Sequence, residues 1–242
     1  MRYFIWFSYD GTNYHGWQLQ PNGDTVQAQL QRALSLLLRE EVTVTGAGRT
    51  DTGVHARQMA AHFDTDVSFE PDVLTKKLNG VLPVDISVSK VEQVADDQHA
   101  RFSAVRRTYH YYIHTRKDPF MRHYSLETHY ELDFELMNKG AQIITQHKDF
   151  ASFCKAGADN KTTLCDVKEC RWIQTSDSSW YLTITANRFL RNMVRATVGT
   201  LFLLGRHRIT LSEFEDILNK GSRNDAGESM PGNALFLESI VY

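Results

Sequence analysis

The sequence predicts an α+β protein built from two related lobes, each with a largely antiparallel sheet flanked by helices. Strand-type alternation and helix-type spacing of apolar residues occur in both halves, without the regular strand–helix order of a doubly wound sheet. The alternation that opens the chain begins again after residue 104. No linker rich in Pro, Gly or Ser separates the halves. We therefore assign residues 1–104 to an N-terminal lobe and residues 105–242 to a C-terminal lobe.

The predicted elements of the first lobe follow from these patterns in order. Residues 2–9 alternate as a strand does, and Asp10-Gly11 supplies a turn. Thr25 is a plausible N-cap for a helix, because Val26, Leu30, Ala33, Leu34 and Leu37 recur at helical spacing. The remaining predicted elements are a short β-branched strand over 42–45, a strand through 60–63, a helix from Pro71 and a strand around 86–94.

The second lobe repeats the mixture of strands and helices. Its predicted strands cover 109–114, 167–173, 181–186 and 235–241, and its predicted helices cover 134–145, about 188–204, and 211–219. In the helix from about 188, Arg188, Arg191 and Arg195 follow spacings of three and four and would share one face.

Composition excludes several classes of protein. The chain has 242 residues, enough for one large domain or two of about 120 residues. No segment approaches the roughly 20 apolar residues of a membrane span, and the N-terminus lacks the apolar run of a signal peptide, so we expect a cytoplasmic protein. Three cysteines without Cys-x-x-Cys spacing indicate free structural thiols. The ten histidines are scattered, and we expect no metal.

The distribution of charge is more informative than the net charge of −2. Cations cluster in two regions, and the acids concentrate elsewhere, as in residues 131–135. Such a dipolar surface is compatible with RNA on one face, because a polyanion is bound by clustered Lys and Arg. The two clusters are Arg101, Arg106, Arg107, Arg116 and Lys117, and Arg188, Arg191, Arg195, Arg206 and Arg208.

The segment 46–55, Gly-Ala-Gly-Arg-Thr-Asp-Thr-Gly-Val-His, carries the strongest chemical signal. It is longer and richer in glycine than a simple hairpin needs, and glycines let a backbone approach a ligand closely. Arg49 lies two residues from Asp51 and could hold its carboxylate ionised. The alternative is an Asx-turn in which Asp51 only stabilises the loop, but such a turn needs neither the arginine nor the Gly-x-Gly.

This segment, followed by His62-Phe63, resembles the signature of the tRNA pseudouridine synthase A family, and four further segments resemble it in the same order. Together these motifs span nearly the whole chain. The four are Tyr9-Asp10-Gly11 with Gly16-Trp17-Gln18; His99 to Ala104 with Arg107-Thr108-Tyr109; Asp149 to Phe153; and Ala186 to Leu190 with Met193-Val194-Arg195 and Val198-Gly199.

The resemblance implies an enzyme that isomerises uridine to pseudouridine without a cofactor, in a cleft between the lobes. Asp51 is then the catalytic carboxylate, and its attack on the sugar, its attack on the base and its removal of a ribose proton stay open as alternatives. Arg195 would pair with Asp51, and Arg49 would lie beside it. Tyr109 would stack on the uracil and take the proton from C5. Taken without the resemblance, Tyr109 would be a packing residue of an aromatic strand and Arg195 a solvated helix charge.

The resemblance also implies a substrate and an assembly. The expected substrate is tRNA, modified at positions 38–40 of the anticodon stem-loop, and the expected assembly is a homodimer with no membrane association. Candidate phosphate contacts are Arg101, Arg107, Lys161, Arg188 and Arg191, which position an RNA without reading its sequence. Lys161 replaces a common arginine of the family in the segment 157–163, which we expect to contact RNA, and Thr52 replaces a common alanine.

Three other functions remain as alternatives at this point. The protein could be a non-catalytic RNA-binding protein on the same scaffold, although it keeps Asp51 and its candidate arginine partners. It could modify another tRNA site or a ribosomal site. It could also be a glycosylase, which flips a base in the same manner but releases free uracil.

Overall fold

The computed structural model describes residues 1–155, 157 and 161–242, and this part of the chain divides into two compact units. The first unit comprises Met1–Val105 with Phe236–Tyr242, and the second comprises Arg106–Leu235. The sequence placed residues 236–242 in the C-terminal lobe. They belong to the first unit because the final strand pairs in parallel with a strand of that unit, His55 opposite Phe236 and Ala56 opposite Leu237.

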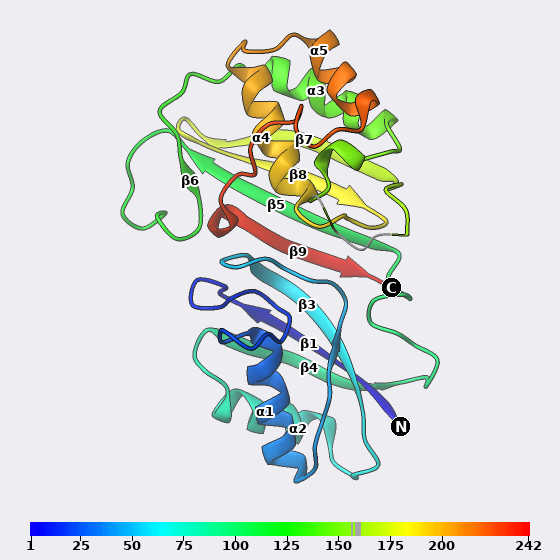
Figure 1. Ribbon diagram of the computed structural model, residues 1–242. Helices are drawn as coiled ribbons and strands as arrows, with labels where there is room; N and C mark the ends of the chain where they lie inside the picture. The colour runs from blue at the N-terminus through cyan, green and yellow to red at the C-terminus, as the bar shows by residue number, and fades with distance from the viewer. Residues whose placement is uncertain (156, 158–160) are drawn as a thin grey trace. The chain divides into compact units, whose positions relative to one another are not determined.

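The first unit is a sheet with two helices (Figure 1). Its strands run in the order β4-β1-β3-β9, and β2 pairs with β3. Strand β1 is antiparallel to both β3 and β4, and helix α2 packs along β4 and against α1. The elements are β1 (Arg2–Tyr9), α1 (Val26–Leu38), β2 (Thr45–Gly46), β3 (His55–Asp64), α2 (Pro71–Val81), β4 (Ile86–Val94) and β9 (Leu235–Val241).

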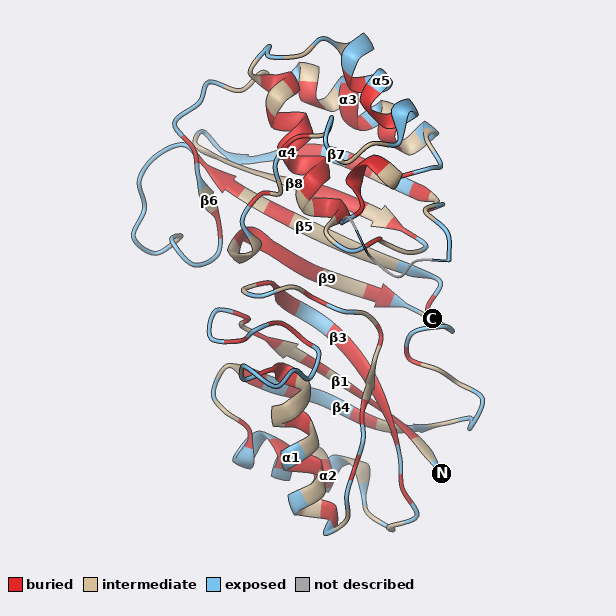
Figure 2. Ribbon diagram, in the orientation of Figure 1, coloured by how far each residue is buried: buried red, intermediate tan, exposed pale blue. Residues whose placement is uncertain are grey.

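The second unit also combines an antiparallel sheet with helices (Figure 1). Strand β8 lies between β5 and β7, and the short β6 runs parallel to β5. Helix α3 packs on β7, α4 and α5, and Figure 2 shows that α4 is almost wholly buried. The elements are β5 (Arg106–His114), β6 (Leu126–Glu127), α3 (Phe134–Gln146), η1 (Ala151–Phe153), β7 (Val167–Ser176), β8 (Ser179–Ala186), α4 (Met193–Gly205), α5 (Leu211–Lys220) and η2 (Gly232–Ala234).

The predicted fold class is confirmed: both units are α+β, and their sheets are largely antiparallel. Local capping signals were also correct. The Thr25 side chain accepts a hydrogen bond from the Ala28 N–H and caps α1, and Pro71 occupies the first turn of α2. The three cysteines are buried and form no disulfide in the described chain, and burial raises the pKa of the Cys165 thiol to about 11. No helix in the described chain is long and apolar enough to cross a membrane.

The strand predicted over 42–45 is wrong except at its end, since β2 comprises only Thr45 and Gly46. The backbone groups of this segment bond to side chains of α1 and its C-terminal turn, not to a neighbouring strand. The Val42 N–H donates to Ser35 Oγ at 2.9 Å, and the Val44 N–H donates to Gln31 Oε1 at 3.2 Å. Such side-chain acceptors compete directly with a sheet ladder for the same backbone donors.

Candidate active site

Asp51 lies in the connection between β2 and β3 and is half-buried. The backbone closes this loop through two hydrogen bonds, from the Ala47 N–H to the Ala60 carbonyl at 2.8 Å and from the Val54 N–H to the Asp51 carbonyl at 3.2 Å. An Asx-turn at Asp51 would use the N–H of Gly53, two residues on. That N–H donates instead to the Tyr14 carbonyl at 3.3 Å. The loop is thus closed by bonds that do not use the Asp51 carboxylate.

The residue before Asp51 is held by the end of β1 and by the segment that follows it. The hydroxyls of Thr50 and Tyr9 share a buried hydrogen bond of 2.9 Å, and the Trp17 N–H donates to the Thr50 carbonyl at 3.2 Å. Gly16 has a φ of +88°, and a Cβ there would lie 2.4 Å from the Thr50 carbonyl oxygen. Only glycine fits this close approach. Trp17 is buried and stacks on Phe7 with centroids 5.6 Å apart.

The end of the loop is held in a similar way. The buried His55 accepts a hydrogen bond at Nδ1 from the Gly11 N–H at 3.0 Å, and Asp10 Oδ1 lies 3.1 Å from the same nitrogen. A Cβ on Gly11 would lie 2.1 Å from the Val54 carbonyl oxygen. The motifs around residues 9–11 and 16–18 thus support the Asp51 loop. The sequence contained these motifs, but only contacts in the folded chain reveal that they hold this loop.

Arg49 is exposed, and no ion pair joins it to Asp51 in the part of the chain that the structure describes. The spacing of the two residues had suggested such a pair. Arg49 and Asp51 therefore share a loop, but their direct partnership is not seen.

Tyr109 belongs to the second unit, on β5, where it pairs in register with Ile184 of β8. Its ring is half-buried and meets Phe189 edge-on, with centroids 5.0 Å apart and planes at 82°. Arg107, two residues earlier on the same strand, donates from a guanidinium nitrogen to the Asn187 carbonyl at 2.8 Å. The structure thus brings the predicted Tyr109 and Arg107 to the segment that contains Arg188.

Arg195 lies in the first turn of α4, and its guanidinium is anchored. Its Nε donates to the Met230 carbonyl at 2.5 Å, and the Met230 N–H donates to the Arg195 carbonyl at 3.2 Å. Gly199 permits this pairing of segments, since a Cβ there would lie 1.9 Å from the Glu228 carbonyl oxygen. Arg195 is therefore not an ordinary solvated charge, because it is half-buried and its Nε bonds to the Met230 carbonyl.

The helix predicted from about residue 188 begins only at Met193. The prediction that Arg188, Arg191 and Arg195 share one helical face is therefore wrong. Arg191 is exposed, and Arg188 is half-buried in the irregular segment that precedes the helix.

Contacts from elsewhere in the chain keep this segment out of the helix. The Asn187 N–H donates to the Asp166 carbonyl at 3.2 Å, and the Lys155 N–H donates to the Arg191 carbonyl at 3.0 Å. Asn192 then takes a left-handed conformation with a φ of 70°, which an α-helix does not allow.

The other predicted RNA contacts are scattered over both units. Arg101 is exposed, with its guanidinium carbon 5.7 Å from the centre of the Phe102 ring, and Lys161 is also exposed. Residues 158–160 of the predicted RNA-contacting segment 157–163 lie outside the described residues. Among the described residues, no group of three or more His, Cys, Asp or Glu could hold a metal ion.

His62 holds the turn that carries Arg101. Its Nδ1 accepts a hydrogen bond from the Ala100 N–H at 3.1 Å, so the ring is neutral, and its ring centroid lies 4.6 Å from that of His99. Burial, helped by the charge of Arg2, lowers the pKa of His62 from 6.5 to about 4.

We therefore expect the free energy of unfolding to fall as the pH drops from 6.5 towards 4. In this range His62 is protonated in the unfolded state but stays neutral in the folded state. The full shift would correspond to about 3 kcal/mol at about 1.4 kcal/mol per pKa unit, and solvent screening lowers the expected loss to on the order of 2 kcal/mol. Urea unfolding across this pH range measures it. His62→Gln should flatten the profile, whereas His15→Gln, a change of an exposed histidine, should keep its shape. An unchanged slope in His62→Gln would contradict the expectation.

Comparison with known proteins identifies the family to which the chain belongs. The family model described as tRNA pseudouridine synthase matches residues 5–103 and 147–242. A tRNA pseudouridine synthase A of Bacteroides thetaiotaomicron is 50% identical over 243 aligned residues, covering 100% of this chain and 90% of its own. Proteins of the same name from Porphyromonas gingivalis and Bacillus subtilis are 48% and 38% identical; each alignment covers 100% of this chain, with 97% and 99% of the respective relative. The chain therefore belongs to the tRNA pseudouridine synthase family.

Proposed function

We propose that this enzyme isomerises uridine to pseudouridine in tRNA, at positions 38–40 of the anticodon stem-loop, with Asp51 as the catalytic carboxylate. Membership of the family supports the reaction and the class of RNA. The observation that carries the assignment to Asp51 is the construction of its loop. Backbone hydrogen bonds from three segments and the Tyr9–Thr50 pair hold the loop, so the position of Asp51 is fixed by groups other than its own carboxylate.

The reaction is an isomerisation, so its atoms balance without a second substrate. The bond from ribose C1′ to uracil N1 breaks, the uracil turns, and C1′ bonds to C5. The proton at C5 leaves, and N1 gains one. Asp51 initiates this sequence by attack on the sugar, by attack on the base or by removal of a ribose proton. Each route requires the target base to leave its stack first.

Tyr109 and Arg195 are proposed to act on the same uridine as Asp51. The edge-on contact with Phe189 supports a fixed orientation of the Tyr109 ring, which suits stacking on the uracil and removal of the C5 proton. The bond from Arg195 Nε to the Met230 carbonyl fixes the plane of the guanidinium, which suits pairing with a carboxylate. Arg49 is proposed as a further cation near the carboxylate. The phosphate contacts proposed are Arg101, Arg107, Lys161, Arg188 and Arg191.

Tritium release from tRNA transcribed with uridine labelled at C5 tests the reaction, because isomerisation must expel that hydrogen and binding cannot. We expect release from a wild-type transcript and none from one in which positions 38–40 hold no uridine. Release from both transcripts would indicate that the enzyme modifies a uridine elsewhere in the tRNA. Binding without release from any tRNA would favour another RNA substrate or a non-catalytic role, and free uracil would indicate a glycosylase.

The homodimer implied by the family resemblance stays a prediction. A single chain has a net charge of −2, so its cationic surface is limited to patches. Two copies would double the cationic surface available to one tRNA. Sedimentation of the free protein and of its tRNA complex measures the number of copies.

A further inference from the structure

An exposed tyrosine stacks on an arginine at the end of α4, in the second unit. The guanidinium carbon of Arg206 lies 3.5 Å from the centre of the Tyr130 ring, within the range of a strong cation–π contact. Tyr130 is nevertheless 51% exposed. Neither residue belongs to the site described above. The pair is a preformed, partly solvent-facing assembly of an aromatic ring and a cation.

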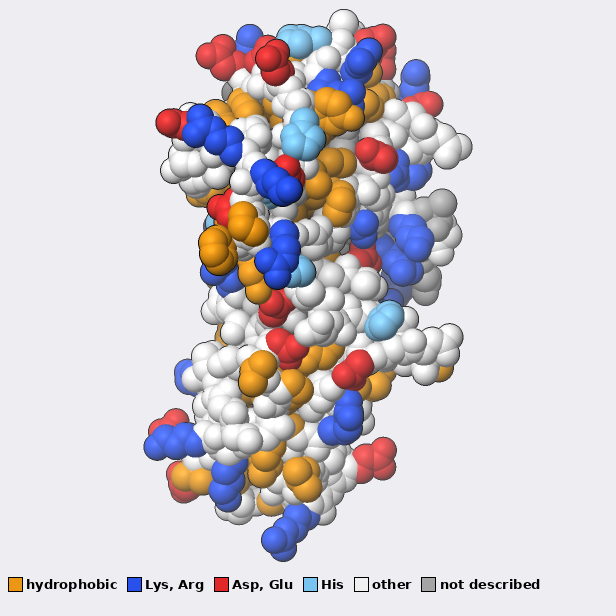
Figure 3. Space-filling model, turned by 90° about the vertical axis from the view of Figure 1, so that its left-hand side faces the viewer, with side chains coloured by type: hydrophobic (Ala, Val, Ile, Leu, Met, Phe, Trp, Pro, Cys, Tyr) orange, Lys and Arg blue, Asp and Glu red, His pale blue; other side chains and the backbone are white. Residues whose placement is uncertain are grey.

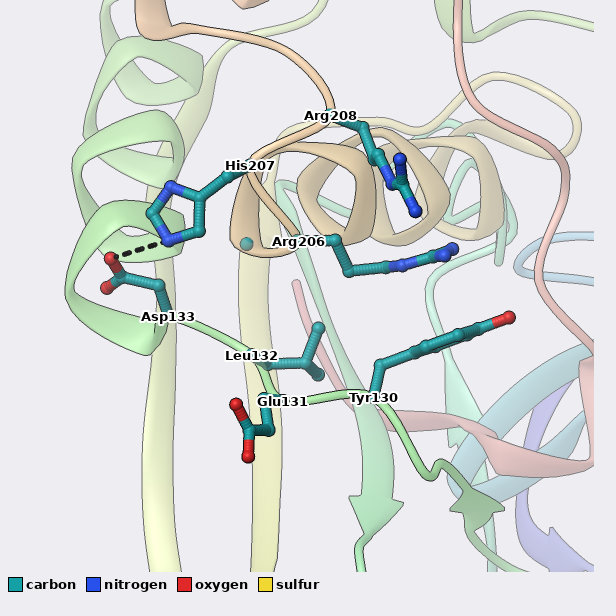
Figure 4. A pocket seen from close by; sticks show the side chains of 8 residues that line it. Tyr130, Glu131, Leu132, Asp133, Arg206, His207 and Arg208 are labelled. Carbon is teal, nitrogen blue, oxygen red and sulfur yellow. Dashed lines mark ion pairs between the residues drawn. The ribbon is translucent and has the colours of Figure 1, made fainter.

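The turn after α4 brings a second arginine to the same place. His207 has a left-handed φ of 53°, and the Arg208 N–H donates back to the Leu203 carbonyl at 2.9 Å. This sharp reversal directs His207 towards Asp133, at 3.4 Å, and away from the two arginines. Figure 4 shows both guanidinium groups and the Tyr130 ring extending in one direction, and His207 extending in the other.

The acidic groups nearby do not neutralise these arginines. Asp133 accepts a hydrogen bond from the Leu136 N–H at the start of α3, and its other oxygen faces His207. Glu131 points away from the guanidinium groups (Figure 4). Within the described chain no ion pair involves Arg206 or Arg208. Figure 3 shows Lys and Arg side chains beside hydrophobic ones on the face of this unit that carries β6.

Two hollows of about 560 and 510 Å³ adjoin the stacked pair, and both volumes are typical of ligand sites. Tyr130 and Arg206 line both hollows. The first also contains Arg208, whereas the second has an apolar wall made of Leu126, Phe202, Leu203 and Met230. The first hollow thus combines both arginines with Glu131 and Asp133, and the second combines its apolar wall with Glu127 and Glu228.

We propose that this surface, composed of Tyr130, Arg206 and Arg208, binds a nucleotide of the tRNA other than the target uridine. The two guanidinium groups present forks of donors that match a phosphate. The Tyr130 ring, which also lines the hollow with the apolar wall, offers a stacking surface for the attached base. A nucleic acid strand supplies both an anion and a flat apolar ring, which is why we assign the surface to RNA. The proposal rests on the proposed function, since it takes tRNA as the partner.

Tyr130→Ala is expected to weaken tRNA binding by about tenfold, since a stacked base contributes about 1–3 kcal/mol. Tyr130→Phe keeps the ring and should bind within about twofold of the wild type. Arg208→Ala should weaken binding and lower the slope of log affinity against log salt by about 0.8, the contribution of one phosphate contact. Arg171→Ala is the matched control. It also removes one exposed cation of the second unit, but one already paired with Glu169 at 2.8 Å.

Affinity is measured by titrating labelled tRNA with each full-length variant at several salt concentrations, with thermal unfolding and sedimentation on the same samples. Wild-type affinity in both Tyr130→Ala and Arg208→Ala would overturn the proposal. A lowered unfolding temperature with unchanged affinity would do so too, because the pair would then only stabilise the end of α4. Altered sedimentation without altered tRNA affinity would assign the surface to a second copy of the chain. Failure of the proposed function is separate, since it would show as no tritium release by the wild type.

Discussion

Asp51→Asn is expected to lower the rate of tritium release by about 10³-fold or more, because the amide keeps the shape of the side chain but cannot act as a nucleophile or a base. tRNA binding should be largely kept. The loop is closed by the backbone bonds of Ala47, Gly53 and Val54, and none of these uses the Asp51 carboxylate. Single-turnover release with enzyme in excess separates this loss of chemistry from any loss of affinity.

Asp72→Asn is the control, since it makes the same chemical change to an exposed carboxylate of the first unit, in the first turn of α2. It should release tritium at the wild-type rate. If Asp51→Asn lost tRNA affinity and unfolding stability together with turnover, Asp51 would be a residue that holds its loop, and the catalytic assignment would fail.

Gly16→Ala is expected to destabilise the first unit by about 3 kcal/mol and to impair catalysis as well. The added Cβ would lie 2.4 Å from the Thr50 carbonyl oxygen, on a backbone with a φ of +88°. Overpacking costs about 1–3 kcal/mol, and a left-handed conformation adds about 1–2 kcal/mol for a residue with a side chain. The clash is with backbone, so the chain must move, and the residue that moves precedes Asp51. Urea unfolding gives the stability, and tritium release gives the activity.

Gly48→Ala is a matched control within the Asp51 loop itself. A Cβ on Gly48 meets nothing within 4 Å, and this glycine does not need a positive φ. Its unfolding free energy should stay within about 0.5 kcal/mol of the wild type. Equal effects of the two substitutions would show that the loop depends on glycine for flexibility, rather than on the close approach of residue 16 to Thr50.

Local patterns predicted most of the secondary structure because the forces involved are local. The Thr25 cap, the apolar face of α1 and the first-turn proline of α2 each involve residues within one or two turns of one another. The segments over 42–45 and 188–192 were wrongly predicted for the opposite reason. In the first, side chains of α1 take the backbone donors. In the second, Lys155 bonds to Arg191, and Asp166 bonds to Asn187 immediately before the segment. A local sequence pattern does not reveal hydrogen-bond partners of this kind.

The same division applies to the candidate site. The sequence by itself determined the α+β class, the family and the candidate Asp51, since these follow from periodicity and from motifs that are short runs of neighbouring residues. Only the tertiary structure decided that Tyr9, Gly11, Gly16 and His55 support the Asp51 loop, that Met230 anchors Arg195, and that Tyr130 stacks on Arg206. These contacts join residues far apart in the sequence, and Tyr130 and Arg206 are 76 positions apart. Distances between such residues are set when the chain packs, and no spacing along the sequence encodes them.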